Sequence, residues 1–248
     1  MVKVGKIEFD NGIPKICVPI VGRTLDEWVQ ECRYLKDKAY DVVELRVDFL
    51  QDVEKLSAVN EVLAAVRREL PDSALLFTFR TKHEGGETEV PDAYYFELVK
   101  AAIRGGKIDA VDLEYFMDQD EIKAVIEIAK AAGVTVIMSN HDFAKTPSFD
   151  EISSRLIGMK KLGADVAKLA CMPQSAKDVL TLLSATESVK AQYPDEPLIT
   201  MSMGKLGAVS RISGEIFGSA MTFGSAKKVS APGQLEVSML HQILEALH

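Results

Sequence analysis

Strand-like runs and amphipathic helical patterns alternate along this chain, eight of each. The strand-like runs are rich in apolar residues and occupy residues 15–20, 42–47, 74–80, 108–114, 134–140, 165–170, 198–203 and 219–224. The helical patterns that follow them occupy residues 25–38, 53–70, 92–104, 119–132, 149–162, 175–192, 206–217 and 234–247. Successive strands begin about 29 residues apart, which is the length of one strand–helix unit.

Eight such units close most simply as an α/β fold, the (β/α)8 TIM barrel, which commonly takes about 250 residues. A doubly wound sheet usually has a glycine-rich phosphate loop after its first strand, but residues 21–24 read VGRT and lack it. We therefore expect a single barrel domain over residues 1–248. Residues 1–14 are expected to form an N-terminal β-hairpin that turns at Asn11-Gly12 and closes the bottom of the barrel.

The composition excludes several classes of protein. With 47% hydrophobic and 27% charged residues, the chain can bury a sizeable core and is not expected to be disordered. Its net charge of −8 disfavours a nucleic-acid partner. The sequence lacks both the apolar run of a signal peptide and an 18-residue apolar span, so we expect a cytoplasmic protein with no membrane partner. Cys17, Cys32 and Cys171 are expected to be reduced core residues.

Polar residues recur at the C-terminal ends of the expected strands, which is where a barrel builds its active face. The second strand carries Glu44, Arg46 and Asp48 at alternate positions, so that all three share one face. Asp112 and Glu114 end the fourth strand. The sequence leaves open whether these two acids pair with neighbouring arginines or take part in chemistry.

Lys168 lies within an apolar strand, where an unpaired ammonium group is costly to bury. A functional role is therefore favoured over a structural one. Burial and nearby Arg46, Arg80 or Arg211 would destabilise the ammonium form and leave a free amine. Such an amine can attack a carbonyl group and form a Schiff base.

His141 is the one histidine among four that ends an expected strand, and that strand precedes the one with Lys168. A lone histidine is more often structural, but beside a buried lysine it can act as a general acid and base. Glu84 follows the third strand in the segment His83 to Glu87. It either orients the imidazole of His141 or is a solvated loop acid.

Metal chemistry is not expected, because HExxH, CxxC and calcium-loop spacings are absent from the sequence. The glycines at 204 and 207 weakly resemble the phosphate loops of barrels, although small residues also allow close packing. Residues 225–234 combine basic, hydroxyl, glycine and proline residues. They are expected to form either an active-site lid or an ordinary loop before the last helix.

Taken in order, the polar motifs resemble the type I 3-dehydroquinate dehydratase family, from about residue 15 to the C-terminus. The motifs are Glu44-x-Arg46-x-Asp48, Phe77-Thr78-Phe79-Arg80, the segment from Val136 to Asp142, Lys168, and Ser230-Ala231-Pro232-Gly233-Gln234. The resemblance implies a cytoplasmic homodimeric lyase that dehydrates 3-dehydroquinate to 3-dehydroshikimate, a step toward chorismate and the aromatic amino acids. It also implies that neither a metal nor an organic cofactor is used.

The same resemblance implies roles for individual residues. Lys168 is expected to form the Schiff base, His141 to act as general acid and base, and Glu84 to orient that histidine. The expected substrate-binding residues are Glu44, Arg46, Arg80, Arg211, Ser230 and Gln234, with Met201 and Phe223 lining the pocket.

Two alternatives remain open from the residues alone. Another Schiff-base barrel lyase, such as a class I aldolase, needs the same lysine but typically has a phosphate site. A barrel that binds a polyhydroxy acid without converting it is also possible, although a binding role does not require a buried amine.

Overall fold

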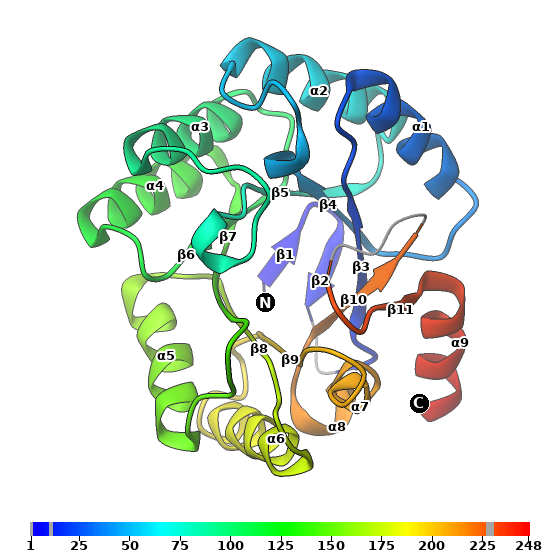
Figure 1. The fold of residues 1–248 in the computed structure, drawn as a ribbon, viewed down its shortest axis with the longest axis vertical. Coiled ribbons are helices and arrows are strands. Elements are labelled where there is room, and N and C mark those ends of the chain that lie inside the picture. The colour runs from blue at the N-terminus through cyan, green and yellow to red at the C-terminus, as the bar shows by residue number, and fades with distance from the viewer. Residues whose placement is uncertain (1, 10–11, 227–230) are drawn as a thin grey trace.

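The computed structural model describes residues 2–9, 12–226 and 231–248. Eight parallel strands form a ring that is surrounded by helices, as Figure 1 shows. The strands of the ring are β3 (Lys15–Ile20), β4 (Val42–Arg46), β5 (Ala74–Thr78), β6 (Ala110–Glu114), β7 (Thr135–Asp142), β8 (Val166–Cys171), β9 (Leu198–Ser202) and β10 (Met221–Ser225). Each expected strand is present within a few residues of its expected bounds, which confirms the α/β barrel.

The ring closes between β10 and its two neighbours. β10 pairs in parallel with β3 over three residues. Its contact with β9 is shorter, through a single bridge between Leu198 and Ser219 and a 2.7 Å hydrogen bond from the Ala220 amide to the Leu198 carbonyl. The hydroxyl of Ser219 also accepts the amide of Thr200 at 3.0 Å, so a side chain continues the pairing where the backbone ladder stops.

The helices form the outer layer and mostly keep their expected bounds. They are α1 (Leu25–Leu35), α2 (Leu56–Glu69), α3 (Asp92–Arg104), α4 (Gln119–Ala132), α5 (Phe149–Leu162), α6 (Ala176–Gln192), α7 (Ala208–Ile212), α8 (Gly214–Phe217) and α9 (Val237–Leu247). Side-chain caps explain several starts. Ser175 and Asp178, for example, form a capping box at the N-terminus of α6.

Two helix predictions were wrong in detail. The single helix expected over 206–217 is divided into α7 and α8, because Ser213 leaves the helical conformation and Gly214 has low helix propensity. The last helix begins at Val237 rather than at 234. The preceding β11 (Leu235–Glu236) pairs with β10 instead, and the side chain of Glu236 then caps α9.

Side chains that alternate along each strand divide the core into two parts. On β4, Val43 and Leu45 pack with the helices, whereas Val42 faces the interior of the ring. Each large apolar side chain buried in this way stabilises the fold by about 1.5–3 kcal/mol. The three cysteines are buried and unpaired, as expected. Among the described residues, none of the helices is long and apolar enough to span a membrane.

The N-terminal hairpin exists, but its expected turn was wrong. β1 (Val2–Val4) and β2 (Ile7–Phe9) pair antiparallel around Gly5-Lys6, rather than around Asn11-Gly12. Gly5 adopts a φ of +58°, which costs glycine little. Asn11 itself lies outside the described residues.

The hairpin lies across the centre of the ring in Figure 1. Val4 and Phe9 are buried in the interior cluster together with Val42, Ala74 and Ala110, which begin β4, β5 and β6. The hairpin therefore closes the N-terminal end of the barrel and leaves the C-terminal end for the polar residues.

Candidate active site

A pocket at the C-terminal ends of the strands brings together ten of the residues that the sequence singled out. They are Glu44, Arg46, Arg80, Glu84, His141, Lys168, Met201, Arg211, Phe223 and Gln234. Ser230 was also expected here but lies outside the described residues. The free space among these side chains is about 40 Å³. The pocket is therefore defined by converging charged groups rather than by its size.

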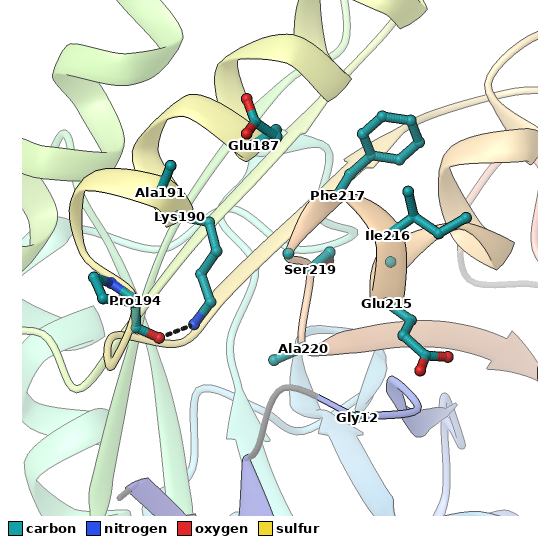
Figure 2. A pocket seen from close by; sticks show the side chains of 12 residues that line it. Gly12, Glu187, Lys190, Ala191, Pro194, Glu215, Ile216, Phe217, Ser219 and Ala220 are labelled. Carbon is teal, nitrogen blue, oxygen red and sulfur yellow. Dashed lines mark hydrogen bonds between the residues drawn. The ribbon is translucent and has the colours of Figure 1, made fainter. Parts of the chain in front are cut away.

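A larger cavity of about 300 Å³ lies near the opposite end of the barrel, between α6 and α8 (Figure 2). Two of its charged side chains are already engaged within the chain. Lys190 donates to the carbonyl of Pro194 at 2.7 Å, and a carboxylate oxygen of Glu215 lies 2.8 Å from Nδ1 of His248. We therefore place the candidate active site in the smaller, charged pocket.

Lys168 projects from β8 into this pocket and is 2% exposed. Its Nζ lies 3.0 Å from Oδ2 of Asp112, 3.8 Å from Oε1 of Glu44 and 4.6 Å from the centre of the Phe223 ring. Lys168 is therefore not unpaired, because two carboxylates and an aromatic face surround its amine. These contacts fix the position of Nζ in the pocket.

Arg80 follows β5 and holds the two acids of β6. Its guanidinium lies 2.7 Å from Asp112 and 2.7 Å from Glu114, and it donates to the hydroxyl of Ser139 at 3.1 Å. Although burial disfavours both charges, the ion pair holds the pKa of Arg80 well above its usual value and that of Asp112 well below. Of the two readings that the sequence left open for Asp112 and Glu114, the ion pair is the one observed.

Arg46 and Asp48 form a second buried pair, with Nε and Nη2 each 2.8 Å from a carboxylate oxygen. β4 ends at Arg46, and a short 3₁₀ turn (Val47–Phe49) brings Asp48 back toward the guanidinium. Such a bidentate pair fixes the plane of the guanidinium. Beside it, Glu44 accepts the hydroxyl of Thr78 at 3.0 Å. Glu44 and Arg46 of the expected polar face therefore lie on β4, whereas Asp48 belongs to the 3₁₀ turn that follows.

Glu84 contacts His141 through both the ring and the backbone of that histidine. Its Oε2 lies 2.9 Å from Nδ1 and accepts the His141 amide at 2.9 Å. A tight turn brings Glu84 back to the pocket. In this turn the backbone of Gly86 lies against the backbone of Arg80. A Cβ atom on residue 86 would lie 1.8 Å from the carbonyl oxygen of Arg80, so the turn requires glycine there. The solvated-loop alternative for Glu84 is excluded by its 2% exposure.

Burial shifts the proton equilibria of this pair in opposite directions. Burial, with Glu114 next, raises the pKa of Glu84 to about 8, while Arg80 opposes the shift. Burial, with the cations of Arg80 and Lys168 next, lowers the pKa of His141 well below its usual value. A neutral imidazole is therefore the resting form, and it can accept a proton.

Arg211 is a buried cation without a carboxylate partner among the described residues. It lies on α7, is 1% exposed, and donates to the carbonyl of Pro232 at 3.0 Å and to the sulfur of Met201 at 3.7 Å. Burial lowers its pKa to about 10. An uncompensated guanidinium beside a pocket favours an anionic ligand there.

Sequence reasoning missed four residues that line the pocket, Gly85, Phe143, Ala170 and Met203. Phe143 directly follows β7, and this position after a strand end could have indicated it. Ala170 and Met203 carry no chemical signal of their own. Among the described residues, no group of three or more His, Cys, Asp or Glu side chains is arranged to hold a metal ion.

Comparisons with known proteins agree with this geometry. Residues 16–248 match the family model described as Type I 3-dehydroquinase. A relative from Listeria welshimeri named 3-dehydroquinate dehydratase is 52% identical over 247 residues, covering 100% of this chain and 98% of its own.

Two solved structures have the same fold over the whole chain. Type I 3-dehydroquinate dehydratase from Clostridium difficile, solved with covalently modified comenic acid, has a TM-score of 0.96 and 48% identity, covering 100% of this chain and 97% of its own. 3-Dehydroquinate dehydratase from Enterococcus faecalis has a TM-score of 0.94 and 40% identity, covering 100% of both chains. The chain belongs to the type I 3-dehydroquinase family.

Proposed function

We propose that this protein dehydrates 3-dehydroquinate to 3-dehydroshikimate, in the shikimate pathway, through a Schiff base on Lys168. The observation that carries the proposal is the position of Lys168, a buried lysine in a pocket that also holds His141 and three arginines. The family relationship supplies the substrate. The covalently modified ligand of the Clostridium difficile relative is consistent with a covalent route.

Substrate binding is proposed to depend first on an ion pair between the substrate and the protein. The carboxylate of 3-dehydroquinate would neutralise Arg211, whose guanidinium has no carboxylate partner among the described residues. The hydroxyl groups would be bound by Glu44, Arg46 and Gln234, with a further polar contact from Arg80. Ser230 is proposed as a ligand from the family resemblance alone. Met201 and Phe223 would limit the access of water to the ring.

Imine formation begins when neutral Lys168 attacks the C3 carbonyl carbon of the substrate. The resulting carbinolamine loses its hydroxyl group as water and becomes an iminium ion. Asp112 keeps its charge, since the pKa of its carboxyl is held well below the usual range. We therefore assign Asp112 the role of stabilising the cation on nitrogen, first as ammonium and then as iminium, rather than that of a base.

The elimination is proposed to use His141 twice. Its imidazole removes the C2 proton, and the electrons of that bond move toward the iminium nitrogen to give an enamine. The enamine electrons then form the C1–C2 double bond as the C1 hydroxyl leaves, with the proton that His141 donates, as water. Hydrolysis of the product imine consumes one water and releases Lys168, so the net reaction is the loss of one water.

The test is reduction of the protein with sodium borohydride in the presence of 3-dehydroquinate, followed by intact mass spectrometry and peptide mapping. We expect one reduced adduct on Lys168, and formation of the conjugated enone without borohydride. Absence of an adduct despite turnover would contradict the Schiff base. Absence of turnover with bound substrate would contradict the dehydratase assignment.

Three further expectations belong to the same proposal. Residues 225–234 are proposed to act as a lid, supported by Ala231 and Gln234 in the pocket lining and by a 3.1 Å hydrogen bond from the Gly204 amide to the Pro232 carbonyl. The homodimer and the cytoplasmic location rest on the family resemblance. Light scattering on the purified protein tests the dimer, and quenching of a label at residue 226 with and without substrate tests the lid.

A further inference from the structure

A chain of hydrogen bonds runs from helix α5 to the imidazole of His141. Arg155 of α5 donates to Oδ1 of Asn140 at 2.7 Å. Asn140 of β7 donates through Nδ2 to Oε1 of Glu84 at 2.9 Å, and Oε2 of Glu84 lies 2.9 Å from Nδ1 of His141. Asn140 is 4% exposed and Glu84 is 2% exposed, so water does not readily replace these contacts.

The chemistry of these groups allows only one arrangement of the Asn140 amide. An amide side chain has one donor end and one acceptor end, whereas a guanidinium group can only donate. Arg155 therefore turns the carbonyl oxygen of Asn140 toward itself and the NH₂ group toward Glu84. Without Arg155, the amide could turn its oxygen toward Glu84, and that orientation favours a protonated carboxyl group.

The orientation of the amide bears on which ring nitrogen of His141 carries the proton. When Glu84 is ionised, it accepts the Nδ1–H of the neutral imidazole, and Nε2 has a free lone pair. When Glu84 is protonated, it donates to Nδ1 instead, and the imidazole proton lies on Nε2. Only the first arrangement lets Nε2 remove a proton from substrate.

We propose that Arg155 and Asn140 are positioning residues, which keep an NH₂ donor on Glu84 and thereby hold His141 in the tautomer with a free Nε2. This inference rests on the proposed function, in that it deepens the role of His141 as the base. Neither residue lines the pocket, so both act only through Glu84.

Other charges act on the same groups and must stay constant in a test. Glu84 is influenced by Arg80, Glu114 and Asp112, and His141 by Arg80, Lys168, Asp112 and Arg46. Arg155 forms an ion pair with Glu151 one turn earlier on α5, and its guanidinium lies 5.2 Å from the Phe116 ring centre. The substitutions below leave the charges around Glu84 and His141 in place, except that of Arg155 itself.

The first test measures kcat and KM against pH for Arg155→Met, which keeps a long side chain but has no donor. Loss of the fixed amide makes Glu84 harder to ionise, so the acid limb of kcat should move up by about 0.5–1 pH unit. At pH 7 this gives about a three- to tenfold loss, with KM within about twofold of wild type. Arg155→Lys retains a donor and should restore most of the loss.

Two variants separate positioning from a general effect on the fold. Glu151→Gln removes the other partner of Arg155 while its donation to Asn140 remains, and it should leave the profile unchanged. Asn140→Leu should shift the acid limb in the same direction as Arg155→Met. Combining the two should then add little, because Arg155 acts through Asn140. Thermal unfolding of each variant verifies that it is folded.

The decisive readout needs no substrate. In ¹⁵N-labelled protein, the ring shifts of His141, assigned by comparison with His141→Gln and followed against pH, should show the change from Nε2–H to Nδ1–H at a lower pH in wild type than in Arg155→Met. Unchanged shifts together with an unchanged acid limb would overturn the inference. Additive effects of the two substitutions would also overturn it. An inactive wild type with the expected tautomer change would contradict the proposed function alone.

Discussion

Asp112 is shared between Lys168 and Arg80 in the interior of the barrel. Its Oδ2 lies 3.0 Å from Nζ of Lys168, and its Oδ1 lies 2.7 Å from Nη2 of Arg80. One carboxylate thus compensates two buried cations, and the second carboxylate near Arg80 is Glu114. Asp112 therefore holds Lys168, the lysine proposed to react, in place, and Arg80 stabilises the negative charge of Asp112.

This sharing predicts that Lys168→Met is inactive but folded. Turnover should fall below detection, since the imine cannot form. Asp112 is not left unpaired, because Arg80 remains 2.7 Å away, so the free energy of unfolding should change by only about 1–2 kcal/mol. Enone formation and urea unfolding check the two parts. Measurable turnover in this variant would exclude Lys168 as the nucleophile.

A larger loss of stability is expected for Asp112→Asn, because this substitution leaves two buried cations without their common partner. Removal of one member of a buried ion pair should lower the free energy of unfolding by about 3–5 kcal/mol. Asp72→Asn is the matched control, because its 2.7 Å pair with Lys6 is exposed to solvent and should contribute little to stability. Equal stability of the two variants in urea would show that Asp112 does not have this role.

The fold could be predicted from the sequence because the spacing of apolar residues and the length of each segment are local features. Together they indicate the eight strands and most of the helices. The errors occur where tertiary contacts decide. The Asn-Gly pair is a strong local turn signal, yet the hairpin turns at Gly5-Lys6, with a register that buries both Val4 and Phe9.

The candidate site could be predicted as a set of residues but not as a set of contacts. Charged residues at strand ends stand out in the sequence, and the barrel brings them together. Their pairing depends on side-chain reach across the ring, as with Lys168 and Asp112, which are 56 residues apart. Asn140 and Arg155 gave no signal in the sequence, because an amide and a helix arginine are ordinary in those positions.

The activity is expected to fall as the pH drops through the neutral range. The proposed chemistry needs Glu84 ionised and His141 neutral. Because the pKa of Glu84 is raised to about 8, the fraction of ionised Glu84 falls as the pH drops below that value. His141 stays neutral over this range, since its pKa is lowered well below the usual value. The profile of kcat against pH should therefore have an acid limb far above the pKa of an ordinary glutamate.

Glu84→Gln tests the origin of that limb. The amide oxygen can still accept the Nδ1–H of His141, but the side chain no longer titrates. We expect kcat at alkaline pH to fall by about tenfold, because a neutral amide stabilises the developing imidazolium less than a carboxylate does. The acid limb should move down or disappear. An acid limb that stays where it is in wild type would assign the titration to another group.

Arg211 should show opposite effects on binding and on stability. Replacing it with Met removes the proposed partner of the substrate carboxylate, so KM should rise by about 10- to 100-fold. The same change removes a buried cation that has no carboxylate partner among the described residues, so the protein should be as stable as wild type or more stable by about 1 kcal/mol.

Arg80→Met is the matched comparison for Arg211→Met. Its guanidinium lies 2.7 Å from both Asp112 and Glu114, and its loss should destabilise the protein by about 3–5 kcal/mol. Urea unfolding and steady-state kinetics on the two variants give both quantities. A large destabilisation of Arg211→Met, or an unchanged KM, would show that its charge is already compensated without substrate.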